Sequence, residues 1–344
     1  MTGRELEERV FSFIEGHDMI AETDTVYAAV SGGADSVCLL FLLHAYSARR
    51  NFSLRVVHVE HGIRGRESLE DERFVRGLCD ELALPLLSFP VDAPRCAEEN
   101  GLSLEEAARK LRYEAFERLD PADTARREGG RVRVALAHHR EDQAETVLLN
   151  LVRGTGLRGL GGMQPVRGRY IRPLLDEERS GIEDYLRQNE LTWREDSTNE
   201  DVRYTRNLIR HRILPVLRSS VNARAVQHIC EAAGYCAGAA AYLETKAQQF
   251  AREHMWTEGG RVIVETVPLR QEERMLRTHV LRLAVQTVRQ GMGLKDIGAV
   301  HISDLDDLVF KPRGKHLDLP GLLKAQRVDK TLVLWVEERK EGRS

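Results

Sequence analysis

Residues 25–47 read TVYAAVSGGADSVCLLFLLHAYS. A β-rich apolar run at 25–30 is followed by a glycine turn and then by a long apolar stretch typical of a buried helix. In a doubly wound α/β fold, such a turn lies at the carboxyl end of the first strand. Glycines there let the backbone approach a ligand, and the N–H groups that open the helix bind an anion. The stretch therefore predicts a phosphate-binding turn at the edge of a parallel sheet.

The strand and helix signals continue to alternate through the first half of the chain. The other apolar runs with strand character are 54–60, 84–91 and 131–139. Helical stretches of more than ten residues separate them, as in βα units. We therefore predict an α/β fold with a doubly wound, mainly parallel sheet and helices on both faces.

The pattern changes after Pro215, where helices and short strands replace the βα alternation. The tail LLKAQRVDKTLVLWVEE alternates apolar and polar residues, which predicts a terminal hairpin. We expect a catalytic domain at 1–217 and a smaller, mainly helical domain at 218–344 that ends in short strands and contacts RNA. A length of 344 residues suits two domains.

Composition excludes several classes of protein. No run approaches the ~20 apolar residues of a membrane span, and the N-terminus lacks a signal-peptide core, so we expect a cytoplasmic protein. The five cysteines contain no CxxC pair, which argues against a zinc ribbon, an iron–sulfur site or a disulfide framework. A net charge of −3 gives no general attraction to nucleic acid, so such binding must come from local basic patches.

The segment 202–224 holds six arginines and no acid. Without acidic partners these side chains should seek phosphates, although a solvated helix face is the alternative. A second basic set follows near the C-terminus, where we expect it to grip a more distant RNA stem. Its members are Lys311, Arg313, Lys315, Lys324 and Arg327.

The glycine turn matches neither of the two best-known phosphate loops. It lacks the GK[ST] of a Walker A loop and the GxGxxG of a dinucleotide site. Asp35 inside the turn would repel phosphate unless a cation lay between them, so we assign it to Mg²⁺. An ordinary glycine-rich turn is the alternative.

Two acids, Asp142 and Glu145, follow the apolar run at 131–139. They are three residues apart on a predicted helix, so both face the crevice at the strand ends. Paired acids there can hold a cationic amine, whereas acids that only complement the helix dipole are the alternative. For His138 and His139 we expect a structural role at the strand end.

These motifs together resemble the tRNA(Ile)-lysidine synthetase family of N-type ATP pyrophosphatases. The resemblance runs in order from about residue 20 to 220 and is weaker beyond, at Gly314-Lys315 and Leu319-Pro320. The usual DD pair has Glu141 in its first position, which leaves the role of Glu141 open. The matching stretches are SGGADS at 31–36, HVEHGIR at 58–64, EAARKLRYEAF at 106–116, HHREDQAET at 138–146, DSTN at 196–199 and RNLIRH at 206–211.

The resemblance implies an enzyme that converts the wobble cytidine of tRNA(Ile) with a CAU anticodon into lysidine. ATP first adenylates the cytidine and releases pyrophosphate, and free L-lysine then displaces AMP at C2. ATP and Mg²⁺ are the implied cofactors. The sequence does not fix the oligomeric state, and we count a homodimer among the expected assemblies.

The resemblance also implies roles for single residues. For ATP these are Ser31, Gly32, Gly33, Ala34, Asp35, Ser36 and His58, with the metal on Asp35. For lysine they are Arg112, Asp142 and Glu145, and for tRNA they are Arg203, Arg206, Arg210 and Lys315. The catalytic set is Asp35, Asp142, Arg206 and Arg210. Spacing does not decide whether Arg206 or Arg210 contacts the adenylate.

Three other functions share parts of this pattern. A tRNA 2-thiocytidine enzyme has the same loop but is expected to carry CxxC-type cysteines. A small-molecule amidotransferase of this loop class would need a glutaminase domain or another source of ammonia. A non-catalytic tRNA-binding module would not need the loop acid and the helix acids, all of which are present.

Overall fold

The computed structural model divides the chain into two compact units, Met1–Gly234 and Tyr235–Ser344. The division lies within helix α11 (Ala225–His254). The expected functional boundary between residues 217 and 218 stays a prediction. The structure describes residues 3–63, 66–119, 130–194, 205–290, 294 and 296–337.

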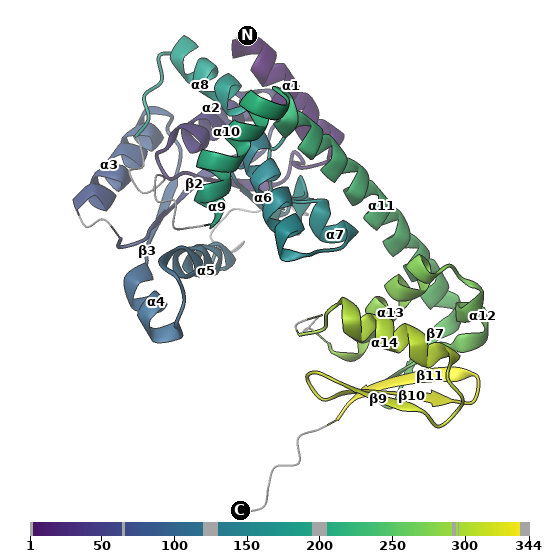
Figure 1. The fold of residues 1–344 in the computed structure, drawn as a ribbon. Coiled ribbons are helices and arrows are strands. Elements are labelled where there is room, and N and C mark those ends of the chain that lie inside the picture. The colour runs from purple at the N-terminus through teal and green to yellow at the C-terminus, as the bar shows by residue number, and fades with distance from the viewer. Residues whose placement is uncertain are drawn as a thin grey trace, which may run out of the picture. The chain divides into compact units, whose positions relative to one another are not determined.

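A six-stranded sheet forms the centre of the first unit, with the strand order β3-β2-β1-β4-β6-β5 (Figure 1). All neighbours pair in parallel except β5 and β6. The predicted doubly wound, mainly parallel sheet is confirmed. The strands are β1 Thr25–Ala29, β2 Ser53–Glu60, β3 Leu86–Pro90, β4 Val132–Ala135, β5 Val166–Arg167 and β6 Tyr170–Ile171.

Helices cover both faces of this sheet (Figure 1). Along β1, Val26 and Ala28 face a core shared with α1, α2, α3 and α8, whereas Tyr27 faces a core shared with α5. Successive side chains of a strand point to opposite faces, so one apolar strand supplies both cores. These helices are α1 Gly3–Gly16, α2 Ala34–Arg49, α3 Arg66–Glu81, α5 Leu104–Glu117 and α8 Arg179–Gln188.

The remaining helical segments of the first unit stand near the strand ends. Helix α6 packs through Ala144 against Ile209, Leu214 and Val226 in a small separate core. This packing brings the arginine-rich segment beside α6. The segments are α4 Ala93–Asn100, α6 Arg140–Arg153, α7 Leu157–Leu160, α9 Thr205–Leu208, the π-helical turn η2 Ile209–Ile213, α10 Leu214–Val216 and the π-helical turn η3 Leu217–Val221.

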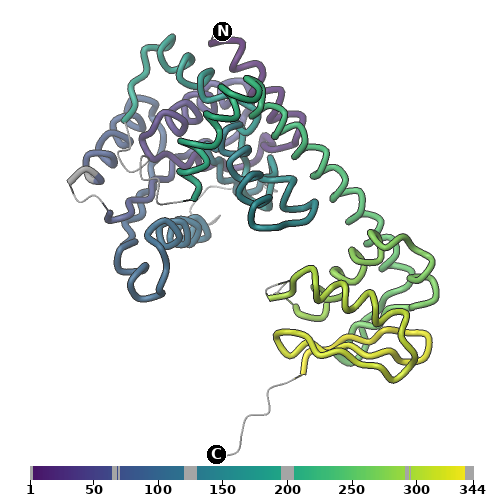
Figure 2. The backbone as a smooth tube through the Cα atoms, viewed as in Figure 1, coloured from purple at the N-terminus to yellow at the C-terminus, as the bar shows by residue number. Residues whose placement is uncertain are grey.

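The second unit contains a five-stranded antiparallel sheet in the order β7-β8-β11-β10-β9. Helices α13 and α14 pack on one side of it (Figure 2). The predicted terminal hairpin is confirmed as β10 and β11, but the sheet is larger than the short strands expected. The elements are β7 Met255–Glu258, β8 Arg261–Glu265, α12 Thr266–Gln271, α13 Arg274–Val288, α14 Ala299–Phe310, β9 His316–Leu319, β10 Leu323–Val328 and β11 Thr331–Val336.

Two predicted absences can be compared with this structure. None of the helices in the described ranges is long and apolar enough to cross a membrane. All five cysteines are free, and Cys38 and Cys79 lie buried.

Candidate active site

The hydroxyl of Ser36 braces the glycine turn between β1 and α2. It accepts the N–H groups of Ser31 and Gly32, each at 3.2 Å, and donates to the carbonyl of Gly33 at 2.9 Å. Ser36 is buried, and its hydroxyl uses these hydrogen bonds to hold the shape of the turn. Its expected contact with ATP stays a prediction.

Two further hydrogen-bond donors hold main-chain carbonyls of the turn. Nδ1 of His58 donates to the carbonyl of Val30 at 2.8 Å, and the main-chain N–H of Arg194 donates to the carbonyl of Gly32 at 3.0 Å. His58 is itself buried in β2, so in this structure it supports the turn. Gly32 has a φ of +98°, a conformation that glycine adopts without strain.

These supports decide which groups of the turn face outward. In a trans peptide the C=O and the N–H point in opposite directions, so a carbonyl tied inward leaves the next N–H directed away. Gly33 caps α2 without a side-chain hydrogen bond, and the first N–H groups of a helix have no partner within it. The turn thus presents N–H groups at a helix N-terminus, an arrangement that binds phosphate.

Asp35 stands beside these N–H groups on the first turn of α2. Its Oδ1 is buried and has no hydrogen-bond partner among the described residues, while Oδ2 lies 3.7 Å from Nε2 of His139. Burial raises the pKa of this carboxyl above its ordinary value. A buried carboxylate oxygen without a donor fits a cation, as the sequence predicts.

His139 connects this loop acid with the acids of α6. Its Nδ1 donates to Glu141 at 2.9 Å, and its Nε2 lies 3.4 Å from Asp142 and 3.7 Å from Asp35. Burial alone would lower the pKa of His139, but the carboxylates of Asp142, Glu141 and Asp35 raise it to about 9. His139 is therefore an imidazolium that bridges three carboxylates at the strand end, a larger role than the one expected.

The two acids of α6 are paired with two arginines. Arg206 donates through Nε to Glu145 at 2.8 Å and through Nη2 to Asp142 at 3.0 Å. Arg210 donates to the same two acids at 2.5 and 2.6 Å. The expectation that these arginines lack acidic partners is wrong, because residues four apart share one helix face and this face packs against α6.

This pairing limits what Asp142 can do. Burial alone would raise the pKa of Asp142, but His139 and Arg206 hold it far below its ordinary value. A carboxylate so stabilised is a weak proton acceptor. Asp142 can therefore take a proton only after one of the neighbouring cations has moved.

Glu141, at the position where the family has aspartate, serves three donors. It accepts from His139, from the main-chain N–H of Arg179 at 3.1 Å and from Arg218 at 2.7 Å. Burial opposes ionisation, but the hydrogen bonds from His139 and Arg218 lower the pKa of Glu141 to about 2. Glu141 thus fixes the N-terminus of α8 and the turn η3 to the site.

Arg112 lies in a different charge environment. Its Nη2 is 3.3 Å from Nε2 of His61, and burial together with Arg109 lowers its pKa. Within the described ranges no carboxylate forms an ion pair with Arg112. These surroundings suit an anion, so a contact between Arg112 and lysine would involve the carboxylate of the amino acid.

A pocket of about 450 Å³ opens beside the paired acids and arginines. It is bounded by α6, the N-terminus of α8, the segment from η2 to η3 and the start of α11. Charges of both signs line it, which suits a zwitterion. The charged lining includes Glu145, Arg179, Glu183, Arg210, Arg218 and Arg224.

The remaining predicted residues lie outside the described residues or in the second unit. Arg203 and the DSTN stretch at 196–199 lie outside the described residues. Lys315 is exposed in the second unit, but Arg327 is buried and donates to the carbonyl of Thr331, so its expected contact with RNA is wrong. Lys324 forms ion pairs with acids of its own unit.

Three supports of the site were not predicted from the sequence. These are the main-chain N–H of Arg179, the main-chain N–H of Arg194 and the ion pair between Arg218 and Glu141. The first two use the peptide group, which every non-proline residue carries, so no residue type marks them. Of these three supports, only the ion pair had a signal in the sequence, which was the charge of Arg218.

Comparison with known proteins places this geometry in a family. The model of the PP-loop domain family matches residues 4–217. The tRNA(Ile)-lysidine synthase of Caldanaerobacter subterraneus subsp. tengcongensis is 36% identical over 334 residues, which are 97% of this chain and 70% of that protein. The chain belongs to the tRNA(Ile)-lysidine synthase family. It is therefore a PP-loop enzyme, and ATP is its substrate.

A second relative agrees with this assignment, and one solved structure shares the fold. The tRNA(Ile)-lysidine synthase of Geobacter sulfurreducens is 41% identical over 318 residues, 91% of this chain and 65% of that one. The solved structure of the U34-tRNA thiolase NcsA from Methanococcus maripaludis, with its [4Fe-4S] cluster, matches with a TM-score of 0.55 at 17% identity. That match covers 68% of this chain and 78% of the thiolase chain, and it supports the fold alone.

Proposed function

We propose that this enzyme joins free L-lysine to C2 of the wobble cytidine in tRNA(Ile) with a CAU anticodon. The product is lysidine, and AMP and pyrophosphate are released. The observation that supports this proposal is the short bridge through His139, which links the phosphate turn to the acids of α6. One site thus offers groups for ATP next to groups for an amine, and the relatives named above carry the same activity in their names.

In the first step, the C2 oxygen of cytidine attacks the α-phosphorus of ATP, and pyrophosphate leaves. The N–H groups of Gly33 and of the first turn of α2 would hold the pyrophosphate, where negative charge grows. Asp35 would hold Mg²⁺, which offsets part of that charge. No three His, Cys, Asp or Glu side chains in the described part of the chain form a metal cage, so the ion would be shared with phosphates and water, as is common for Mg²⁺.

In the second step, the ε-amine of lysine attacks C2 and AMP leaves. Asp142 and Glu145 would hold the ammonium group before reaction. Because Arg206 and Arg210 already occupy these acids, the incoming ammonium would release one arginine toward the phosphate of the adenylate. Such an exchange explains how the same two arginines can support both lysine binding and AMP departure. It also frees Asp142 to take the proton.

The pocket beside these acids would hold the rest of lysine. A volume of about 450 Å³ lies within the range of small-molecule sites. Arg179, Arg218 and Arg224 would attract the carboxylate, and Glu183 would attract the α-amino group. Lining charges of both signs select an amino acid over a simple diamine, which lacks the carboxylate.

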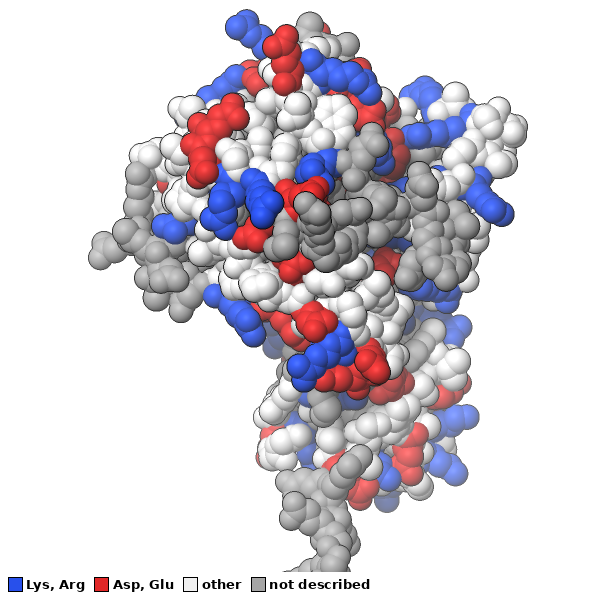
Figure 3. Space-filling model, turned by 90° about the vertical axis from the view of Figure 1, so that its left-hand side faces the viewer, with Lys and Arg blue, Asp and Glu red and all other residues white. Residues whose placement is uncertain are grey.

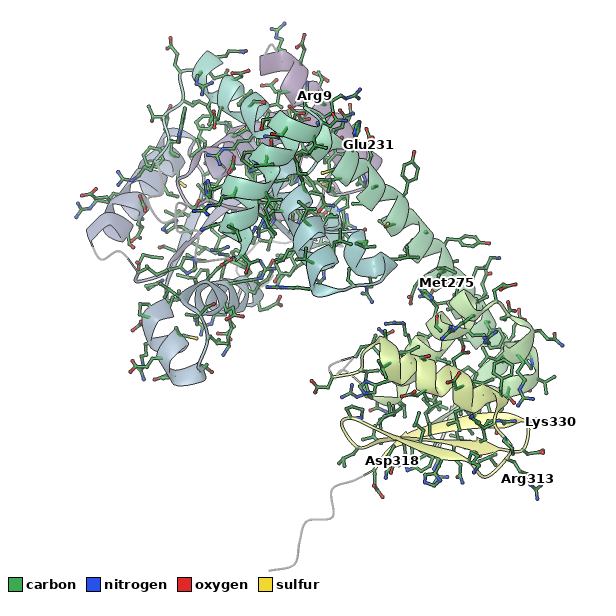
Figure 4. The ribbon with its side chains drawn as sticks, in the orientation of Figure 1. Arg9, Glu231, Met275, Arg313, Asp318 and Lys330 are labelled. Carbon is green, nitrogen blue, oxygen red and sulfur yellow. The ribbon has the colours of Figure 1, made fainter. Side chains whose placement is uncertain are left out.

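For tRNA we propose contacts from the arginines of segment 202–224, with Arg203 among them, and from exposed cations of the second unit. Lys311, Arg313 and Lys315 are exposed, and Arg313 projects from the surface of its unit (Figure 4). On the face shown in Figure 3, basic and acidic side chains are interspersed. On that face, binding by a few local contacts therefore fits better than binding by one continuous basic surface. A homodimer remains part of the proposal.

The direct test follows AMP release by the full-length protein. With ATP and Mg²⁺, release should require tRNA with a CAU anticodon, and lysine should accelerate it. Ornithine, which is one methylene shorter, is the control for the amine. Release of AMP that depends on a sulfur donor and ignores lysine would favour the 2-thiocytidine activity instead. Release without any tRNA would point to a small-molecule acceptor.

A further inference from the structure

We infer that Arg194 is a positioning residue for the phosphate turn. Its main chain orients the peptide between Gly32 and Gly33, and its side chain is fixed by Asp71 and Glu70 of α3. The inference rests on the proposed function only in that the turn binds the phosphates of ATP.

The contact concerns one peptide of the turn. The N–H of Arg194 donates to the carbonyl of Gly32 at 3.0 Å. The N–H of Gly33 belongs to the same peptide and therefore points in the opposite direction, toward the side where the phosphates would lie. The hydrogen bond from Arg194 thus decides where a phosphate-binding N–H is directed.

Two other carbonyls near the turn, those of Val30 and Gly33, are held by the elements that build it. His58 of β2 holds the carbonyl of Val30, and Ser36 of α2 holds that of Gly33. The carbonyl of Gly32 instead depends on Arg194, a residue outside β1, β2 and α2. Two adjacent glycines make this peptide free to rotate once its hydrogen bond is lost, because neither carries a side chain.

The side chain of Arg194 explains why this distant residue stays in place. Its Nε donates to Asp71, and its Nη2 donates to Glu70 at 3.2 Å. The preceding Trp193 and Leu191 pack against the main core of the first unit. A guanidinium can engage two carboxylates at fixed angles, whereas an ammonium is a point charge. These contacts therefore hold the short segment 191–194 against the turn.

The test measures nucleotide binding apart from the rest of the reaction. Full-length variants Arg194→Ala, Arg194→Lys, Asp71→Asn and the double variant Asp71→Asn/Arg194→Ala are compared by calorimetry. The probe is the α,β-methylene analogue of ATP with Mg²⁺, without tRNA. Arg76→Ala is the matched control, because it removes an ion pair with Glu72 on the same helix without a contact to the turn. Lysine KM and the melting temperature are measured for each variant.

We expect Arg194→Ala and Asp71→Asn each to weaken binding of the analogue about fivefold to tenfold, the size of one directed hydrogen bond. Lysine KM should stay within about twofold. The double variant should bind the analogue no more weakly than the single variant with the lower affinity, because both changes break the same ion pair. Arg194→Lys should recover only part of the affinity, because an ammonium keeps the charge but not the fixed angles of the two contacts. Arg76→Ala should match the wild type.

Unchanged binding in Arg194→Ala with a lower melting temperature would overturn the inference, as would additive losses in the double variant. A rise in the lysine KM as large as the loss of affinity for the analogue would also overturn the inference. If Arg194→Ala does not fold, Asp71→Asn and Arg194→Lys decide the question. A wild-type protein that binds the analogue but makes no lysidine would refute the proposed function and leave the inference standing.

Discussion

Glu145 and Arg210 are separated by 65 residues in the chain and meet as a two-pronged ion pair in the first unit. Oε1 of Glu145 accepts from Nε at 2.5 Å, and Oε2 accepts from Nη2 at 3.0 Å. Glu145 is fully buried, so its charge depends on this arginine and on Arg206. The acids proposed to bind lysine are therefore already paired with arginines and fixed in position before lysine arrives.

Glu145→Gln should raise the lysine KM by about tenfold or more and leave the ATP KM within about twofold, because it removes charge only where the ammonium would lie. The free energy of unfolding should fall by about 3 kcal/mol, since two partly buried arginines would then share one acid whose own site is buried. Steady-state kinetics and denaturant unfolding measure the two effects. Glu99→Gln, at an exposed ion pair on α4, is the control. Equal rises in both KM values would assign Glu145 to the nucleotide or to structure alone.

Substitutions of Arg210 and Lys315 should change different kinetic parameters. Arg210→Ala should lower kcat at saturating tRNA by about a hundredfold, because it removes a positive charge from the site of the adenylate. Since Arg210 is already paired with acids, the salt dependence of tRNA binding should change little. Lys315→Ala should raise the tRNA KM, leave kcat nearly unchanged and reduce the salt slope by about one unit.

The control for this pair is Lys330→Ala, which removes another exposed cation of the second unit. Filter binding over a range of salt concentrations and single-turnover kinetics give the comparison. If Arg210→Ala and Lys315→Ala proved kinetically indistinguishable, the division of labour between the two basic regions would be wrong.

Asp35→Ala should abolish AMP formation and leave the fold intact. The carboxylate has a buried oxygen without a donor among the described residues, so its removal costs a cation site and no core contact. Asp35→Asn keeps the shape and removes the charge, and it should be as inactive. Circular dichroism checks the fold, and AMP release checks the activity. Normal turnover in either variant would rule out the assignment of Mg²⁺ to Asp35.

His139 should make stability fall in alkaline solution. Its pKa is raised from 6.5 to about 9, so the folded state holds a proton that the unfolded state loses first. The stabilisation is fully present below pH 6.5 and is lost as the pH rises through 9, by at most about 3 kcal/mol. Urea unfolding of the wild type between pH 6.5 and 10 should show this loss, and His139→Gln should not. Parallel curves for the two proteins would contradict a charged His139.

The parts of the fold with a clear period were predictable. Strand β1 and helix α2 follow directly from the apolar runs on either side of Ser31. Strands β5 and β6 were not predictable, because two residues carry no period. The second sheet was underestimated for a similar reason, since β7 and β9 are only four residues long.

The residue types of the site were predictable, whereas the interaction partners of these residues were less so. The loop acid and the helix acids were found because their spacing relates to a strand end. The pairing of Arg206 and Arg210 with these acids was not found, because a local count of charges does not register residues that folding brings together. The contact between Arg194 and Gly32 involves two peptide groups, which no side-chain pattern reveals.

The proposed reaction bonds lysine to a cytidine of tRNA. The most direct measurement incubates the full-length protein with ATP, Mg²⁺, isotope-labelled L-lysine and a tRNA(Ile) transcript with a CAU anticodon, and then digests the RNA to nucleosides for mass spectrometry. We predict one labelled nucleoside with the mass of cytidine plus lysine minus water, located at the wobble position and absent from a transcript with uridine there. Label found only as free lysine, or only as an ester at the 3′ end of the tRNA, would contradict the account.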